Sequence, residues 1–305
     1  MQKSKILVIG SSNTDMVAKT VRLPKPGETI IGGDFFMFAG GKGANQAVAA
    51  ARLGAQVTFG CNLGNDLFGK KAIEYFQKDA IDISYATLDL DQPTGVAVIS
   101  VDKNAENTII VAPGANATLS PKHISNMEKA FQEADIILTQ LEIPLETTNA
   151  ISAMAKKHQK RLIINPAPAR TIPSEVLNNL FLITPNETET ELLTGVYPDN
   201  FEKCETATAK LLSMGVQHVI ITLGEKGAFF KSKTESFLVA SEKVKAIDTT
   251  AAGDVFNGAL AVSLANGKNW KESISFANKA AAFSVTKMGA QTSAPNLKEL
   301  IPILN

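Results

Sequence analysis

A seven-residue segment, Asp-Thr-Thr-Ala-Ala-Gly-Asp at residues 248–254, carries the side chains best placed to do chemistry. An apolar stretch at residues 255–262 follows it directly, so the spacing predicts that a loop turns into a helix here. The N–H groups at a helix N-terminus bind anions, and a neighbouring carboxylate can accept a proton. The segment therefore suits phosphoryl transfer with Asp254 as the base, although an Asp that merely caps a helix has the same position.

The glycine-rich segment Ala-Gly-Gly-Lys-Gly-Ala-Asn-Gln at residues 39–46 is a second candidate. It is not a Walker A phosphate loop, because Lys42 is followed by Gly43 where that loop has Ser or Thr. Glycines let a polar ligand approach the backbone, and the Asn45 amide can both donate to a hydroxyl and accept from it. Beside the Asp254 segment this pattern indicates a sugar site, and a tight strand-to-helix turn is the structural alternative.

Acidic side chains follow two of the expected strands. Asp15 comes shortly after the first strand, at the end where open α/β sheets bind ligands, and its carboxylate could hold two vicinal hydroxyls. Glu142 lies in the same way beyond the expected strand at residues 136–138, directly after residues 139–141. An Asx turn or a helix cap is the commoner role for such residues, and their shared placement favours a functional role.

Two further loops are candidates for a nucleotide site. Asn186 and Glu189 lie three apart at the start of an expected helix, where oxygen ligands suit Mg²⁺ held through water, and a capping box has the same spacing. The loop at residues 222–227 contains two glycines, which would let it pass against phosphates or ribose. A plain hairpin into residues 228–230 explains this loop equally well.

The composition limits the choice of partners. Lys plus Arg and Asp plus Glu both total 30 in 305 residues, so nothing in the net charge indicates nucleic acid or an anionic membrane, and we expect a small-molecule partner. The two cysteines and three histidines are scattered, which predicts neither a zinc site nor a disulfide framework. Without a signal peptide or a run of roughly 18 apolar residues, the sequence predicts a cytoplasmic protein.

Short apolar runs alternate with helical patterns along most of the chain. We expect buried strands at residues 6–9, 57–61, 136–138, 162–164, 181–183 and 219–221. Helical patterns occur at residues 44–53, 67–78, 121–133, 145–158, 187–193, 206–214, 253–267 and 270–288. The alternation predicts one α/β domain over residues 1–305, with a doubly wound, mostly parallel sheet flanked by helices.

Two regions depart from this alternation and predict a small β-strand lid. Residues 95–102 and 107–111 form a hairpin pattern across the polar turn at residues 103–106. We expect lid strands from about residues 14–39 and 94–112, inserted in the domain and able to cover a site.

Taken together, these segments resemble the ribokinase (PfkB) family of carbohydrate kinases. The resemblance runs essentially end to end, and it is carried by residues 13–15, 40–45, 165–169, 184–187, 248–254 and 289–291. One position departs from the family pattern, since the usual Gly-Ala-Gly-Asp is Ala251-Ala252-Gly253-Asp254 in this chain. We interpret this departure as the mark of a subfamily.

The resemblance implies ATP-dependent phosphorylation of D-ribose at O5, giving D-ribose 5-phosphate and ADP. It implies that Asp254 is the catalytic base and that the backbone N–H groups of Ala251, Ala252, Gly253 and Asp254 form an anion hole. The implied sugar-binding residues are Asn13, Thr14, Asp15, Gly40, Gly41, Lys42, Gly43, Ala44, Asn45, Glu142 and Asp254. The implied ATP-binding residues are Asn186, Thr222, Leu223, Gly224, Glu225, Lys226, Gly227, Gly253, Asp254 and Asn278.

The resemblance also implies two metal ions and a partner subunit. Glu189 would organise Mg²⁺ through water. An activating K⁺ would lie near the anion hole, at Asp248, Thr250, Ser284, Lys287, Gly289 and Ser293. Lys287 could contribute only its backbone carbonyl, because its ammonium would repel the ion. Lids from two subunits would pair to make a homodimer, which would cover an otherwise exposed apolar hairpin.

Three alternatives to ribose phosphorylation stay open. Another substrate of the same family, such as deoxyribose, a ketohexose or adenosine, differs by few hydroxyl contacts. An NAD-dependent oxidoreductase fits the alternating pattern, but the first strand lacks the Gly-x-Gly-x-x-Gly fingerprint. A sugar-sensing protein without catalysis would be favoured by loss of Asp254 or of the loop glycines, and all of these are present.

Overall fold

The computed structural model describes residues 3–104, 106–178 and 180–304. Across these residues the main sheet has eight strands, which are, in spatial order, β14 (Ser236–Val239), β13 (Ala228–Lys231), β12 (His218–Thr222), β11 (Leu182–Ile183), β10 (Arg161–Ile164), β9 (Ile136–Thr139), β1 (Lys5–Ile9) and β4 (Gln56–Gly60). The strands from β12 to β4 are parallel, and β13 and β14 are antiparallel at one edge.

Helices cover both faces of this sheet, because successive side chains of a strand point to opposite sides. Ile6 and Val8 belong to one core, and Leu7 and Ile9 belong to the other. The first face carries α1 (Lys42–Arg52), α2 (Leu67–Lys78), α9 (Ala252–Ala265), α10 (Trp270–Ser284) and α11 (Leu297–Leu304). The second face carries α3 (Pro121–Asn126), α4 (Glu128–Glu133), α5 (Leu145–Lys157), α6 (Ser174–Leu177), α7 (Glu187–Thr194) and α8 (Phe201–Ser213). The doubly wound, mostly parallel α/β fold is confirmed.

Three helices differ in their ends from the sequence-based expectation. The pattern at residues 121–133 forms both α3 and α4, because a tight turn at Met127 separates them. Helix α8 begins at Phe201, earlier than expected, since Asn200 caps it. Helix α10 ends at Ser284, and a loop containing Gly289 at φ 87° follows it. Among the described helices, none is long and apolar enough to cross a membrane.

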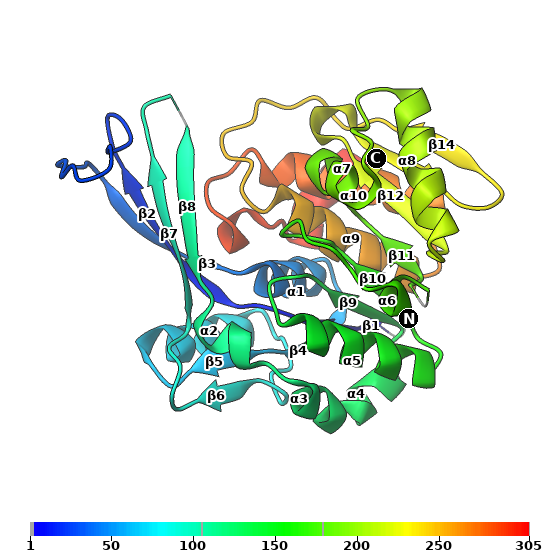
Figure 1. Ribbon diagram of the computed structural model, residues 1–305, viewed down its shortest axis with the longest axis horizontal. Helices are drawn as coiled ribbons and strands as arrows, with labels where there is room; N and C mark the ends of the chain where they lie inside the picture. Colours follow the sequence, from blue (N-terminus) through cyan, green and yellow to red (C-terminus); the bar gives the residue numbers. More distant parts are fainter. Residues whose placement is uncertain (1–2, 105, 179, 305) are drawn as a thin grey trace.

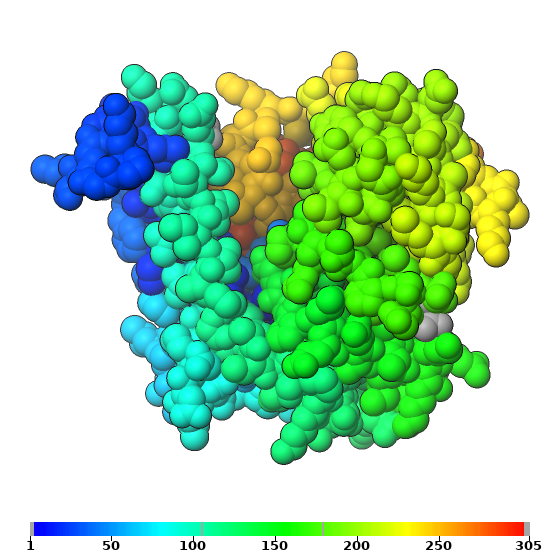
Figure 2. All heavy atoms as spheres, viewed as in Figure 1, coloured from blue at the N-terminus to red at the C-terminus, as the bar shows by residue number. Residues whose placement is uncertain are grey.

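A second sheet, here called the side sheet, stands away from the main body (Figure 1). Its strands among the described residues are, in order, β3 (Phe35–Gly40), β2 (Asn13–Lys19), β7 (Gly95–Val101) and β8 (Asn107–Ala112). Strands β7 and β8 are antiparallel neighbours, which confirms the expected hairpin. A small pair, β5 (Asn62–Gly64) and β6 (Thr87–Asp89), lies at its base. Figure 2 shows that the molecule is hollowed between the side sheet and the main body.

Arg52, at the end of α1, joins three segments that are distant in sequence. Its guanidinium makes two hydrogen bonds to the carboxylate of Asp79, at 2.8 and 3.0 Å. It also donates to the carbonyls of Gln291 (2.6 Å) and Ala294 (3.1 Å). Both charged side chains are largely buried, at 22% and 17% exposed. Arg52 therefore ties α1 to the end of α2 and to the segment before α11.

We expect Arg52→Met to lower the free energy of unfolding by about 2–4 kcal/mol, because Asp79 and two carbonyls lose their donor. Urea denaturation followed by circular dichroism measures this difference. The control is Lys129→Met, which removes an exposed ion pair to Glu133 and should change stability by less than about 0.5 kcal/mol. Equal effects of the two substitutions would contradict the role of Arg52.

Candidate active site

The first turn of α9 is open. Helix α9 begins at Ala252, and its N-cap Ala251 has left-handed backbone geometry, with φ 60° and ψ 11°. The amides of Gly253 and Asp254 donate to none of the described groups, and a Cβ built on Gly253 would meet nothing within 4 Å. This turn thus offers two free N–H groups beside open space, a geometry that binds phosphate.

Asp254 does not cap α9, so the capping interpretation is wrong. Its carboxylate accepts hydrogen bonds of 2.9 Å from the side-chain amides of Asn45 and Gln46 on α1. Burial raises the pKa of Asp254, while Lys42 and the two amides oppose that rise. The Oδ1 atom of Asn45 is buried without a partner among the described residues. A ligand hydroxyl beside Asp254 would supply the donor that this oxygen lacks.

Asp15, on β2, faces the same region. Burial, with the nearby charges of Glu142 and Asp254, raises the pKa of Asp15 to about 7, and Lys42 opposes this rise. A Cβ on Gly40 would lie 2.2 Å from the Asp15 carboxylate, so any larger residue there would displace that carboxylate. The structure therefore brings together the acids that the sequence placed at separate strand ends.

Neighbouring side chains that sequence reasoning missed orient Glu142 and Asn13. Glu142 Oε2 accepts from the Ser11 hydroxyl (2.5 Å) and from the Lys42 amide (3.1 Å). Asn13 Oδ1 accepts from Asn116 Nδ2 at 2.8 Å. Ser11 lies in the polar run directly after the first strand, which was a usable signal, whereas Asn116 is distant in sequence. Along one side, Asn13, Asn116 and Glu142 line a cavity of about 380 Å³.

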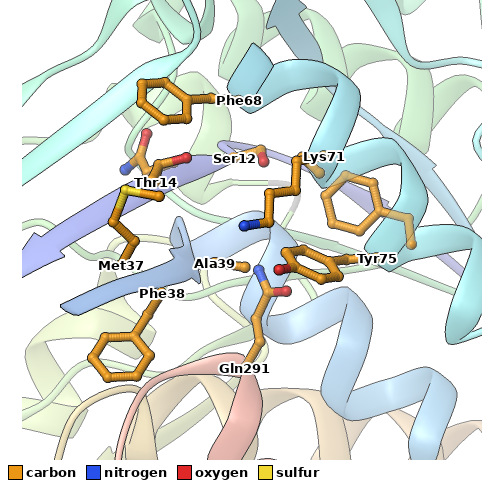
Figure 3. A pocket seen from close by; sticks show the side chains of 12 residues that line it. Ser12, Thr14, Met37, Phe38, Ala39, Phe68, Lys71, Tyr75 and Gln291 are labelled. Carbon is orange, nitrogen blue, oxygen red and sulfur yellow. The ribbon is translucent and has the colours of Figure 1, made fainter.

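Thr14, Gly43 and Ala44 were expected to bind the sugar, but the structure gives them other neighbours. Thr14 lines a small pocket with Lys71 and Tyr75 (Figure 3), because its side chain alternates with that of Asp15 along β2. The amides of Gly43 and Ala44 donate to Ser11, to its hydroxyl (3.3 Å) and its carbonyl (2.8 Å). Gly41 has φ 88°, and a Cβ there would lie 2.6 Å from the Asn13 nitrogen.

The expected Mg²⁺ residues form a capping box at the start of α7. The Glu189 N–H donates to Asn186 Oδ1 (2.8 Å), and the Asn186 N–H donates to Glu189 Oε2 (2.9 Å). The capping interpretation is confirmed. Glu189 is only 6% exposed, and burial raises the pKa of its carboxyl, while Lys42 acts in the opposite direction.

The loop after β12 is a hairpin, since Thr222 pairs with Ala228. Its tip is a 3₁₀ turn, Gly224–Lys226, which exposes Gly224, Glu225 and Lys226 and leaves Leu223 buried. Gly227 has φ 102°, and a Cβ there would lie 2.1 Å from the Val239 carbonyl. Asn278 donates to the carbonyls of Val239 (3.0 Å) and Ala240 (3.2 Å). The end of β14 thus connects the two parts of the expected nucleotide site.

Comparison with known proteins identifies the family. Residues 3–297 match the pfkB family of carbohydrate kinases. The chain belongs to this family. It is 42% identical to a ribokinase of Haemophilus influenzae over 299 residues, 98% of each protein, and 36% identical to a deoxyribokinase of Salmonella typhi over 295 residues, 96% of each. The solved structure of an Arabidopsis thaliana ribokinase complexed with ribose and ATP is 33% identical, with a TM-score of 0.94 over 100% of this chain and 99% of that chain.

In this pfkB kinase the expected K⁺ residues lie on two segments, residues 248–250 and 284–293, which a hydrogen bond between Gly289 and Asp248 joins. Asp248 accepts from the N–H groups of Thr250 (2.9 Å) and Gly289 (2.8 Å). Burial raises the pKa of Asp248, but these hydrogen bonds outweigh it and hold the pKa below its usual value. Ser284 and Ser293 donate their hydroxyl protons to the carbonyls of Ala281 and Ala290. The Lys287 ammonium pairs with Glu299 at 2.8 Å.

We expect Asp254→Asn to lower kcat by about 10²- to 10⁴-fold, because the amide cannot accept the substrate proton. The nitrogen of the new side-chain amide would lie against the NH₂ group of Asn45 or of Gln46, and neither group could accept its hydrogen. The free energy of unfolding should therefore also fall by about 1–3 kcal/mol. Steady-state kinetics with ATP and D-ribose measure the first effect, and thermal unfolding measures the second. Turnover within threefold of the unmodified protein would remove Asp254 as the base.

If Asp15 binds the sugar, as the resemblance implies, its raised pKa makes that binding pH-dependent. Below about pH 7 this carboxyl is largely protonated, and above it the carboxylate can accept hydrogen bonds from two hydroxyls. We therefore expect the Kd for D-ribose to fall roughly tenfold from pH 6 to pH 8, as the competent fraction rises. Calorimetric titration measures this change, and Asp15→Asn should bind weakly with no dependence in that range. The same pH slope in both proteins would contradict the assignment.

Proposed function

We propose that this kinase transfers the γ-phosphoryl group of ATP to O5 of D-ribose, giving D-ribose 5-phosphate and ADP. The observation that carries the proposal is the buried Asp254 carboxylate beside two free amides at the start of α9. The ribokinases among the relatives, one of them complexed with ribose and ATP, support the choice of sugar and nucleotide.

The reaction needs a base and a stabiliser of charge. Asp254 accepts the proton of the O5 hydroxyl, O5 forms a bond to the γ-phosphorus, and the bond from phosphorus to the bridging oxygen breaks, with its electron pair leaving on ADP. Burial favours the protonated form of Asp254 and so suits it to receive that proton. The Gly253 and Asp254 amides donate to the oxygens of the transferred group.

Asp15 and Asn45 set the substrate class. The Asp15 carboxylate accepts from two vicinal hydroxyls, and the partnerless Asn45 oxygen accepts from another. A sugar that lacks one of these hydroxyls leaves a buried acceptor unsatisfied, which costs affinity. Deoxyribose is the second candidate substrate, since a deoxyribokinase is among the relatives.

Two cations complete the proposal. Each Glu189 oxygen accepts one hydrogen bond from Asn186 and keeps further lone pairs, so this carboxylate fits Mg²⁺ held through water, which would neutralise phosphate charge. The ion pair to Glu299 directs the Lys287 ammonium to another partner, so this residue fits a K⁺ site that takes only its carbonyl. Asp248 supplies the negative charge at that site.

We also propose that the side sheet is a lid and that two lids pair in a homodimer. Ile109, Ile110 and Val111 of β8 are 54%, 71% and 47% exposed, and Val98 of β7 is 51% exposed. An edge strand with such an apolar surface is an aggregation hazard unless a partner covers it. A cytoplasmic location stays a prediction from the sequence.

An ADP-release assay tests the proposed function. With ATP and Mg²⁺ we expect turnover to be fastest on D-ribose, slower on 2-deoxyribose, fructose and adenosine, and faster in K⁺ than in Na⁺. Faster turnover on another sugar would keep the chemistry and overturn the choice of substrate. No turnover on any of these would overturn the proposal.

A further inference from the structure

Gln46 is not among the site residues that the sequence predicted, yet its side chain contacts the proposed base, Asp254. It is the fifth residue of α1 and is 0% exposed, so no sugar or nucleotide can reach it. Its Nε2 donates to Asp254 Oδ1 at 2.9 Å and to Asn165 Oδ1 at 3.1 Å. Its Oε1 accepts from Gln140 Nε2 at 2.6 Å. Both N–H groups of the Gln46 amide thus donate a hydrogen bond, and its oxygen accepts one, which leaves a second lone pair on Oε1 unused.

The neighbours of Gln46 allow its amide one orientation. A reversed amide would set its oxygen against the oxygens of Asp254 and Asn165, and its NH₂ against that of Gln140. Asn165 cannot reverse to accommodate this change, because its Nδ2 donates to the Thr184 carbonyl at 3.1 Å. The NH₂ group of Gln46 is therefore held toward the Asp254 carboxylate.

From Thr184 the hydrogen bonds continue to α9, the helix that carries Asp254. The Thr184 hydroxyl donates to Asn257 Oδ1 at 2.6 Å, and Asn257 Nδ2 donates to the Gly253 carbonyl at 2.8 Å. That carbonyl belongs to the peptide group whose N–H is the free amide of Asp254. Gln46, Asn165, Thr184 and Asn257 are all nearly buried, at 7% exposed or less. The path thus links the base to one donor of its own anion hole.

We infer that Gln46 is a positioning residue for phosphoryl transfer, which fixes the rotamer of Asp254 through the buried path from Gln140 to the Gly253–Asp254 peptide. This inference rests on the proposed role of Asp254 as the base. Gln46 acts through Asp254 and touches no substrate. Its donor also favours the ionised carboxylate, which must be present before O5 can give up its proton.

The decisive variant is Gln46→Met, which keeps the length of the side chain and removes the donor. We expect kcat to fall roughly 10- to 100-fold, because a misplaced base costs rate and not substrate affinity. The KM values for D-ribose and ATP should stay within about threefold, since the buried Gln46 contacts neither. The acid limb of the pH dependence of kcat should move to higher pH, because Asp254 loses a donor to its charged form.

Two other variants complete the test. Gln140→Met removes one of the three hydrogen bonds that hold the Gln46 amide and should lower kcat in the same direction by a smaller factor, roughly three- to tenfold. Thr139→Val is the matched control, because it removes a buried hydrogen bond of 2.8 Å to the Ile9 carbonyl, outside the path. It should lower the unfolding temperature and leave kcat and its pH profile unchanged. If Gln46→Met does not fold, Gln140→Met decides.

The outcomes separate this inference from the proposed function. If the unmodified protein phosphorylates D-ribose and folded Gln46→Met keeps its kcat and pH profile, the inference is wrong and the proposed function stands. An equal loss in Thr139→Val, or a rise in KM with an unmoved pH profile, would reduce Gln46 to a structural role and overturn it. If the unmodified protein prefers another sugar, the choice of substrate fails, and the same comparison is made with that sugar.

Discussion

The site depends on burying one carboxylate where two helices cross. Asp254 is 5% exposed, and such a group is tolerated only with donors in contact, which α1 supplies from Asn45 and Gln46. The helices must also lie close together. A Cβ on Gly258 would stand 2.8 Å from the Ala49 side chain, so the small residues on both helices serve the same contact. The packing of the two helices and the placement of the proposed base thus depend on the same contact.

Charge is the second constraint on the site. Burial lowers the pKa of the Lys42 ammonium. Four nearby carboxylates outweigh this effect and raise that pKa, namely Asp254, Glu142, Glu189 and Asp15. The acids in turn raise one another's pKa, as at Asp15. In the proposed function the Asp15 and Asp254 carboxylates accept from the sugar hydroxyls, while the uncharged amides at α9 donate to the phosphate. On that proposal, the two substrates meet different chemistry on the two sides of Asp254.

Local pattern was enough for much of the fold. Apolar runs located the strands, as at residues 136–138 and 219–221, because a strand buried on both faces must be continuously apolar. Helix ends were predicted less well. Asn200 caps α8 ahead of the periodic residues, and the early end of α10 follows from the loop at Gly289, whose amide bonds to Asp248. That partner lies 41 positions away, beyond the reach of any local pattern.

The sequence by itself determined the chemistry that this protein can carry. Glycines, acids and amides at strand and helix ends indicated a phosphate site beside a sugar site because several of them occur together, although each alone has a commoner structural use. Only the tertiary structure decided how they are held. Whether Asp254 caps its helix or turns to α1, and which way Gln46 directs its amide, depend on partners distant in sequence, whereas the capping box of Glu189 needs only Asn186, three positions away. Hydrogen bonds act over about 3 Å in space, so only folding selects among these partners.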